Sequence, residues 1–69
     1  MIEVFKTNVR KLNTSEALIQ KLLLHFPDTK INFDLSDCDK ILRVEGDHFS
    51  PAKIIEFLHS CGYQLEILP

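Results

Sequence analysis

Apolar and polar residues alternate with a period of two in four short segments of the chain, which is the pattern of β-strands that bury one face. The segments are residues 1–7, 31–36, 40–45 and 64–68. In the first segment, Ile2 and Val4 share one side and Glu3 takes the other. The residues that we expect to face inward in the later segments are Ile31, Phe33, Leu35, Leu42, Val44, Leu65 and Ile67.

The segment after the first strand carries apolar residues at three- to four-residue spacing, which is typical of an amphipathic helix. Asn13 or Thr14 can accept a hydrogen bond from an N–H of the first turn, so we expect one of them to cap the helix. With Asn13 as the cap, Glu16 falls where it can reach back to it. Pro27 ends the helix. Its apolar face is expected to comprise Ala17, Leu18, Ile19, Leu22, Leu23 and Phe26, with Gln20 and Lys21 outward.

A second helix is predicted to begin at Ser50-Pro51. The Ser50 hydroxyl can cap the helix, and the Pro51 ring already has a helical φ at a position that needs no N–H. Gly62 stands where a left-handed residue ends the helix. The apolar face is expected to comprise Ile54, Ile55, Leu58 and Cys61.

The resulting order, β-α-β-β-α-β, is the ferredoxin-like plan of the α+β class. Right-handed crossovers place the first and third strands at the centre of a four-stranded antiparallel sheet, with both helices on one face. The other face is expected to be wet and to carry Glu3, Asn32, Asp34, Arg43 and Glu66. Chain direction brings three connections, residues 7–13, 36–39 and 61–63, to one end of the domain. Residues 36–39 supply the chemistry of a tight turn.

Composition indicates one small globular domain and narrows the classes of partner. The chain has 69 residues, of which 45% are hydrophobic and 26% charged, so we expect a single domain over 1–69. Ten acidic residues against eight Lys and Arg give a net charge of -2, which argues against nucleic acid and against a membrane surface as partners. No apolar run reaches the roughly 20 residues of a membrane span, and no signal-like pattern opens the chain, so we expect a cytoplasmic location.

Four segments follow one another in a fairly specific order and spacing. They are Phe5-Lys6-Thr7-Asn8-Val9, residues 39–47, Ser50-Pro51 with Ile54-Ile55, and Cys61-Gly62-Tyr63 before the last strand. Together they resemble the heavy-metal-associated domain family, which includes copper chaperones and the metal-binding modules of transport ATPases. The resemblance covers nearly the whole chain and implies a heavy-metal-associated-like domain over residues 1–69. In that family, a C-x-x-C motif in the first loop holds Cu(I) or a similar soft ion near a helix N-terminus.

This chain carries Lys11-Leu12-Asn13-Thr14 at the position of that motif, or a neighbouring register of the same stretch. A protonated Lys and a Leu offer no lone pair, and amide or hydroxyl oxygens are hard ligands with little affinity for Cu(I). Arg10 and Lys11 also place cations at the positive end of the helix dipole. We therefore expect no metal ligands, no cofactor and no catalytic residues in this loop.

A relocated metal site is the alternative, because Cys38, Cys61 and His59 come from loops or helix ends on one side of the predicted fold. The simpler interpretation is that Cys61 is a small buried hydrophobe and Cys38 an exposed turn thiol. The two cysteines form neither a C-x-x-C motif nor a zinc-type ligand series, and we expect no structural disulfide.

Other potential ligands have simple structural explanations. His25, His48 and His59 lie far apart in sequence and are expected at surface positions or helix ends. The aspartates at 34, 37 and 39 resemble a cluster of oxygen ligands, but a calcium loop needs more ligands and a glycine at fixed spacing. A solvated turn is the better interpretation.

Other functions found on this fold need residues that the chain lacks. RNA-binding domains stack bases on aromatic residues of the third strand, and residues 40–45 contain none. Acyl-phosphate hydrolases use an Arg in a glycine-bearing loop, and Asn8-Val9-Arg10 has no glycine beside it. No nucleophile with a base, and no pair of carboxylates in a cleft, can be assigned. We therefore expect that the protein is not an enzyme.

The sequence thus predicts a small non-catalytic binding or interaction protein that resembles heavy-metal-associated domains and has lost the soft-metal site. Its partner would be another protein, bound through the charges of Arg10, Lys11, Asp37 and Asp39, or a second copy bound at an exposed sheet edge. The alternative is a metal-binding protein for heavy-metal transport or homeostasis that uses Cys38 and Cys61, within one chain or between two.

Overall fold

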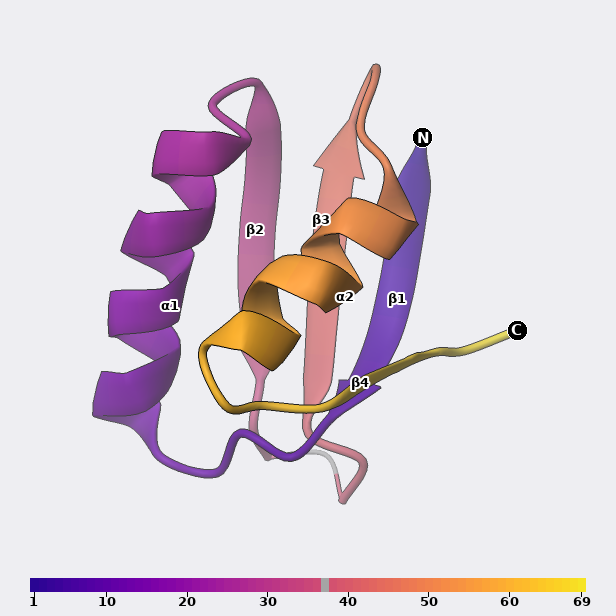
Figure 1. Cartoon of the computed structure of the whole chain (residues 1–69). Helices are drawn as coiled ribbons and strands as arrows, with labels where there is room; N and C mark the ends of the chain where they lie inside the picture. Colours follow the sequence, from indigo (N-terminus) through magenta and orange to yellow (C-terminus); the bar gives the residue numbers. More distant parts are fainter. Residues whose placement is uncertain (37) are drawn as a thin grey trace.

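The computed structural model describes residues 1–36 and 38–69. It contains the predicted order of four strands and two helices (Figure 1). They are β1 (Ile2–Thr7), α1 (Leu12–His25), β2 (Thr29–Asp34), β3 (Ile41–Gly46), α2 (Pro51–Ser60) and β4 (Leu65–Ile67). The strands form one antiparallel sheet in the order β2-β3-β1-β4. The predicted α+β ferredoxin-like arrangement is confirmed, with β1 and β3 at the centre and β2 and β4 at the edges.

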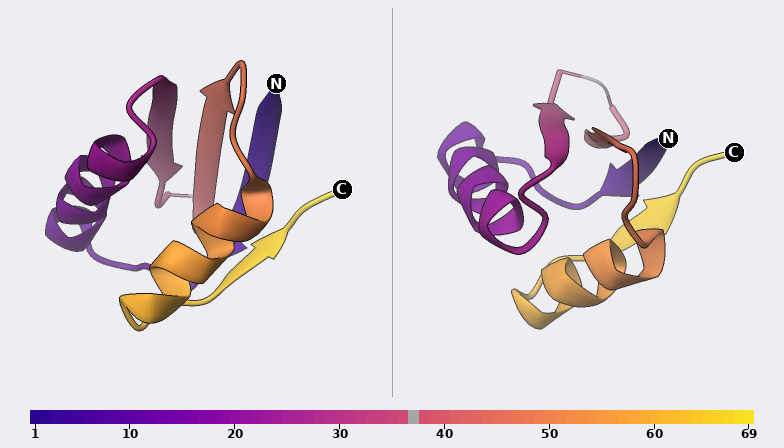
Figure 2. Two further views of the ribbon diagram at one scale, coloured as in Figure 1. Left: turned by 45° about the horizontal axis from the view of Figure 1, so that its top comes forward. Right: turned by 90° about the horizontal axis from the view of Figure 1, so that it is seen from above.

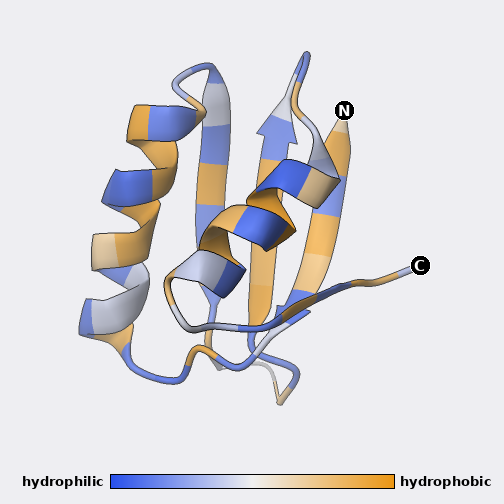
Figure 3. Cartoon of the chain, viewed as in Figure 1, coloured by the Kyte–Doolittle hydropathy of each residue, from blue (hydrophilic) through white to orange (hydrophobic). Residues whose placement is uncertain are grey.

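Both helices cover the same face of the sheet. Figure 2 shows α1 beside the edge strand β2, while α2 lies towards β4 at the opposite edge. The core between the layers is built from Phe5, Val9, Leu18, Leu22, Ile31, Leu42, Val44, Ile54 and Leu58. Apolar and polar positions alternate along the central strands, as Figure 3 shows, because successive side chains point to opposite faces.

The side-chain alternation of β1 is opposite to the one that the sequence predicted. Phe5 pairs with Leu42 and is fully buried under the helices, and Glu3 shares that face because it pairs with Val44. Val4, opposite Arg43, lies on the open face together with Ile2. The prediction that Glu3 faces water on the open side is therefore wrong, because burial of the large Phe5 ring sets the alternation of the whole strand.

The rest of the predicted open face is confirmed by the pairing register. Asn32 lies opposite Arg43, and Glu66 lies opposite Lys6 on the same side of the sheet. Asp34 also lies there, opposite Ile41. On the helix side, Ile31 pairs with Val44 and Phe33 with Leu42, so the inward set of β2 and β3 is as predicted.

Helix α1 begins earlier than its sequence indicated. Lys11 is the N-cap and its side chain makes no capping hydrogen bond, so the prediction of Asn13 or Thr14 as the cap is wrong. The Lys11 carbonyl accepts the N–H of Ser15 at 3.0 Å, which starts the helical ladder before Asn13. The Asn13 amide oxygen accepts the N–H of Thr14 at 2.9 Å from inside the helix.

The buried face of α1 also differs from the prediction. Ser15, Leu18 and Leu22 are buried, and Ile19 and Phe26 pack against the core. Ala17 and Leu23, which were expected on this face, are exposed, because the helix is rotated towards the side that contains Ser15. The helix ends at His25, immediately before Phe26 and Pro27, as predicted.

Helix α2 begins and ends as its sequence predicts. The Ser50 hydroxyl accepts the N–H of Lys53 at 3.4 Å, and Pro51 opens the helix. Ile54 and Leu58 are fully buried. Gly62 has φ +94, a left-handed conformation that favours glycine. Within the described residues, neither helix is long and apolar enough to cross a bilayer.

Candidate interaction surface at the loop end

Three connections lie together at one end of the domain, the lower end in Figure 1, and we call this region the loop end. It comprises residues 8–11, the described part of 35–40, and residues 61–64. The Asn8 N–H donates to the Gln64 carbonyl at 3.3 Å, and the Gln64 N–H donates to the Asn8 amide oxygen at 2.9 Å. These bonds join the first and last of the three connections, so the predicted clustering of loops is confirmed.

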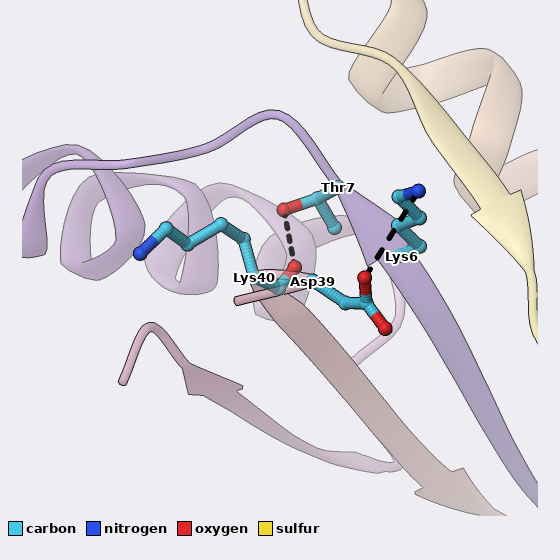
Figure 4. Close-up of polar contacts among 4 residues, drawn as sticks. All are labelled: Lys6, Thr7, Asp39 and Lys40. Carbon is cyan, nitrogen blue, oxygen red and sulfur yellow. Dashed lines mark hydrogen bonds and ion pairs between the residues drawn. The ribbon is translucent and has the colours of Figure 1, made fainter. Parts of the chain in front are cut away.

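Thr7 fixes the first connection to the second. Its hydroxyl donates to the Lys40 carbonyl at 2.7 Å (Figure 4). The same hydroxyl accepts the Val9 N–H at 3.2 Å. Its own N–H donates to the same Lys40 carbonyl at 3.0 Å. Lys40 has φ +52, and its ammonium donates to the Leu35 carbonyl at 2.8 Å. The backbone on both sides of the loop end is therefore held by specific hydrogen bonds.

The connection from β1 to α1 presents cations and one large apolar side chain to solvent. Arg10 and Lys11 are exposed, and the Leu12 side chain that follows them is 69% exposed. No acidic residue occupies the first turn of α1, so the positive end of the helix dipole adds to these charges. These side chains offer no soft donor to a metal ion.

The two cysteines occupy different environments. Both are free thiols. Cys38 is exposed on the turn, as expected, whereas Cys61 packs against the core but is only half-buried, not fully buried as predicted. Cys61 lines a shallow hollow with Tyr63 and with Asn13 and Thr14 of α1. Among the residues that the structure describes, no three His, Cys, Asp or Glu side chains gather into a group that could hold a metal. Cys38, Cys61 and His59 are therefore not brought together as one ligand set.

The remaining predicted ligands serve as ordinary surface groups. His25, His48 and His59 are exposed, and the His25 ring lies against Phe57 with centroids 4.6 Å apart. The surface positions expected for the histidines are confirmed.

The aspartates of the turn make polar contacts in the described part of the chain. Asp34 accepts hydrogen bonds from the Ser36 hydroxyl at 2.6 Å and from the Ser36 N–H at 3.2 Å. Asp39 lies 4.0 Å from the Lys6 ammonium across the strands (Figure 4). Asp37, which was expected to add its charge here, lies outside the described residues.

Sequence reasoning missed two features of this end of the molecule. The sequence pattern indicates Thr7 only as the end of a strand, although its place two residues after Phe5 puts it on the buried side. The sequence pattern also gives no sign that Leu12 is exposed, because this exposure follows from the rotation of α1.

The chain matches no protein-family model, and comparison with curated proteins and with solved structures also gave no match.

Proposed function

We propose that this chain is a non-catalytic protein-interaction domain on the plan of heavy-metal-associated domains, in which the soft-metal loop has become a cationic contact surface. The observation that carries the proposal is the start of α1, where Lys11 is the N-cap and Leu12 is 69% exposed. In the family that the sequence resembles, a pair of thiolates occupies this point. Here an ammonium, an alkyl group and a hydroxyl stand in their place.

Two properties of the loop end support an interaction role. Its backbone is held by Thr7 and Asn8, so the exposed side chains are displayed on a fixed support. Exposed Arg10 and Lys11 attract an acidic partner at long range, and Leu12 provides apolar area for contact. A protein partner needs such a preorganised patch, whereas a Cu(I) ion needs sulfur donors.

The experiment that tests this proposal is a competition titration with Cu(I) on reduced protein. We expect the wild-type chain to leave the ion with a competing chelator. The matched variant K11C/T14C places two thiols at the N-cap and three residues later, on one side of the first turn and beside the positive end of the dipole. We expect this variant to take one ion per chain from the chelator.

Two outcomes would contradict the proposal. Stoichiometric binding by the wild-type chain that disappears in Cys61→Ser would favour the alternative, a metal-binding protein that uses Cys61 and Cys38. Failure of K11C/T14C to bind Cu(I), with the fold intact by circular dichroism, would contradict the proposal that this loop corresponds to the metal-binding loop of the family. Cys38→Ser alone serves as the control for adventitious binding by an exposed thiol.

A further inference from the structure

The two edges of the sheet are unequal. The edge strand β4 has three residues, whereas β2, the opposite edge strand, has six and, in the described part of the chain, pairs with β3 alone. A short edge gives little room for another strand, but a six-residue edge presents a row of backbone groups that another strand can bind. The β2 edge is therefore the surface of the sheet that is best suited to an added strand.

We propose that the β2 edge binds β2 of a second copy of this chain, antiparallel and centred on Asn32, so that two sheets join into one. This inference deepens the proposed function, because it names one partner of the interaction domain. In that register, Lys30 of each chain lies opposite Asp34 of the other on the open face. Ile31 lies opposite Phe33 of the other chain on the helix face. The strand is thus complementary to itself in both charge and hydrophobicity.

Neighbouring registers lack this complementarity. A pairing centred on Ile31 places Lys30 opposite Asn32, and one centred on Phe33 places Asp34 opposite Asn32, so neither forms an ion pair. A slip of one strand by a single residue would set Ile31 opposite Asn32, and so the apolar side of one strand against the polar side of the other. An edge lysine normally discourages strand addition, and the register centred on Asn32 sets this lysine opposite a carboxylate. Asp34 can accept the Lys30 ammonium in addition to Ser36, because a carboxylate has several acceptor sites.

Helix α1 carries a second self-complementary surface beside the same edge. Leu12, Ile19 and Leu23 lie on one side of the helix, opposite Lys21. Lys21 lines the hollow towards Cys61 and Tyr63, so the apolar side of α1 faces away from α2 and outward past β2. Leu12 is 69% exposed and Leu23 is 37% exposed, with Ile19 partly buried between them. These three side chains form what we call the α1 stripe.

One two-fold axis can relate both the β2 strands and the α1 stripes of the two copies. The Thr29 hydroxyl donates to the Phe26 carbonyl at 2.6 Å, so the end of α1 and the start of β2 lie at one level. Forward along β2 from that level, Asn32 lies three residues or about 10 Å away. Backward along α1 from the same level, Ile19 lies seven residues or about 10 Å away. Ile19 therefore lies near the axis, with Leu12 of one copy towards Leu23 of the other. A symmetric dimer of this kind has the same patch on both subunits.

Sedimentation analysis tests the proposal, with a chelator and a reductant present so that neither metal nor disulfide can join two chains. We expect the wild-type chain to form a weak dimer of twice the 8.0 kDa mass at concentrations up to about 1 mM, since an interface of one strand and three side chains is small. Leu23→Lys should weaken the dimer about tenfold or more. The matched control Leu24→Lys, a neighbour that is 81% exposed away from the stripe, should change it less than about twofold.

Charge exchange tests the register itself. K30D and D34K each set like charges opposite one another in the dimer and should each weaken association about tenfold, while K30D/D34K restores the pairs and the affinity. Circular dichroism checks each fold, because Lys30 also faces Glu45 within the chain.

The outcomes separate this inference from the proposed function. A wild-type chain that stays monomeric up to about 1 mM overturns the inference and leaves the Cu(I) result standing. A dimer that responds equally to Leu23→Lys and Leu24→Lys, or is not restored by the double exchange, also overturns it. A dimer that appears only without the chelator would contradict both proposals.

Discussion

Helices α1 and α2 lie on the same face of one sheet, yet their sequences define them very differently. Helix α2 opens with a hydroxyl that accepts a first-turn N–H and with a proline in the next position. Helix α1 opens at Lys11, whose side chain makes no capping bond. The comparison teaches that a local cap fixes where a helix begins, whereas an uncapped helix takes its start and its rotation from packing against the sheet.

The apolar residues of the two helices show the same difference. In α2, Ile54 and Leu58 are both fully buried, as their spacing predicts. In α1, three successive leucines have exposed fractions of 0% for Leu22, 37% for Leu23 and 81% for Leu24. Spacing separates Leu22 from Leu24, but it also put Leu23 on the buried face, because several rotations of the helix bury an acceptable set.

The largest expected effect is a difference in stability between alanine variants of Leu22 and Leu24. Leu22→Ala should lower the free energy of unfolding by about 2–5 kcal/mol, because it leaves a cavity at a fully buried position. Leu24→Ala should change it by less than about 0.5 kcal/mol. Urea unfolding of both variants measures the difference. Equal losses would contradict the rotation of α1 described above.

A smaller effect is expected at the start of α2. Ser50→Ala removes the acceptor of the Lys53 N–H and should cost about 1 kcal/mol. Asn13→Ala, at the residue that the sequence suggested as the cap of α1, should cost less than about 0.5 kcal/mol, since alanine is the better helix former inside the first turn. Thermal unfolding of Ser50→Ala and of Asn13→Ala compares the two losses of stability. A greater cost for Asn13→Ala would reverse the contrast between the helices.

The smallest expected effect is a gain in stability. Lys11→Asp puts a capping carboxylate at the uncapped start of α1 and removes a cation from the positive end of its dipole. We expect a rise of about 0.5 kcal/mol in the free energy of unfolding at low ionic strength. Lys21→Asp, in the middle of the same helix, is the control and should give no gain. A melting temperature unchanged by Lys11→Asp would mean that the helix start is already satisfied.

The sequence was sufficient for the order of strands and helices because period-two and helical spacing are local signals. It was also sufficient for the clustering of the loops, which follows from chain direction once the order is known. It was insufficient for the alternation of β1, where Ile2 and Val4 on one side compete with Phe5 on the other. That choice depends on Leu42, which is distant along the chain and pairs with Phe5 only in the folded sheet.

The candidate surfaces were predictable to a similar extent. The lack of cysteine in residues 8–14 is plain in the sequence, and the exposure of Arg10 and Lys11 follows from their polarity. The α1 stripe could not be predicted, because it depends on a rotation that Ser15 and Leu18 set by packing. The complementarity of Lys30 and Asp34 is present in the sequence, but it acquires meaning only when β2 is known to lie at an edge.

The hydrogen bonds of Thr7 have a consequence for the evolution of this end of the domain. Among the residues that the structure describes, the hydroxyl bonds only to backbone atoms, the Lys40 carbonyl and the Val9 N–H, so this anchor does not depend on the side chains of Arg10, Lys11 and Leu12. Substitutions at these three exposed positions therefore leave the anchor in place, whereas Val9 is fully buried and Asn8 accepts the Gln64 N–H with its side chain. A small domain of this design is a ready scaffold for grafting new recognition loops.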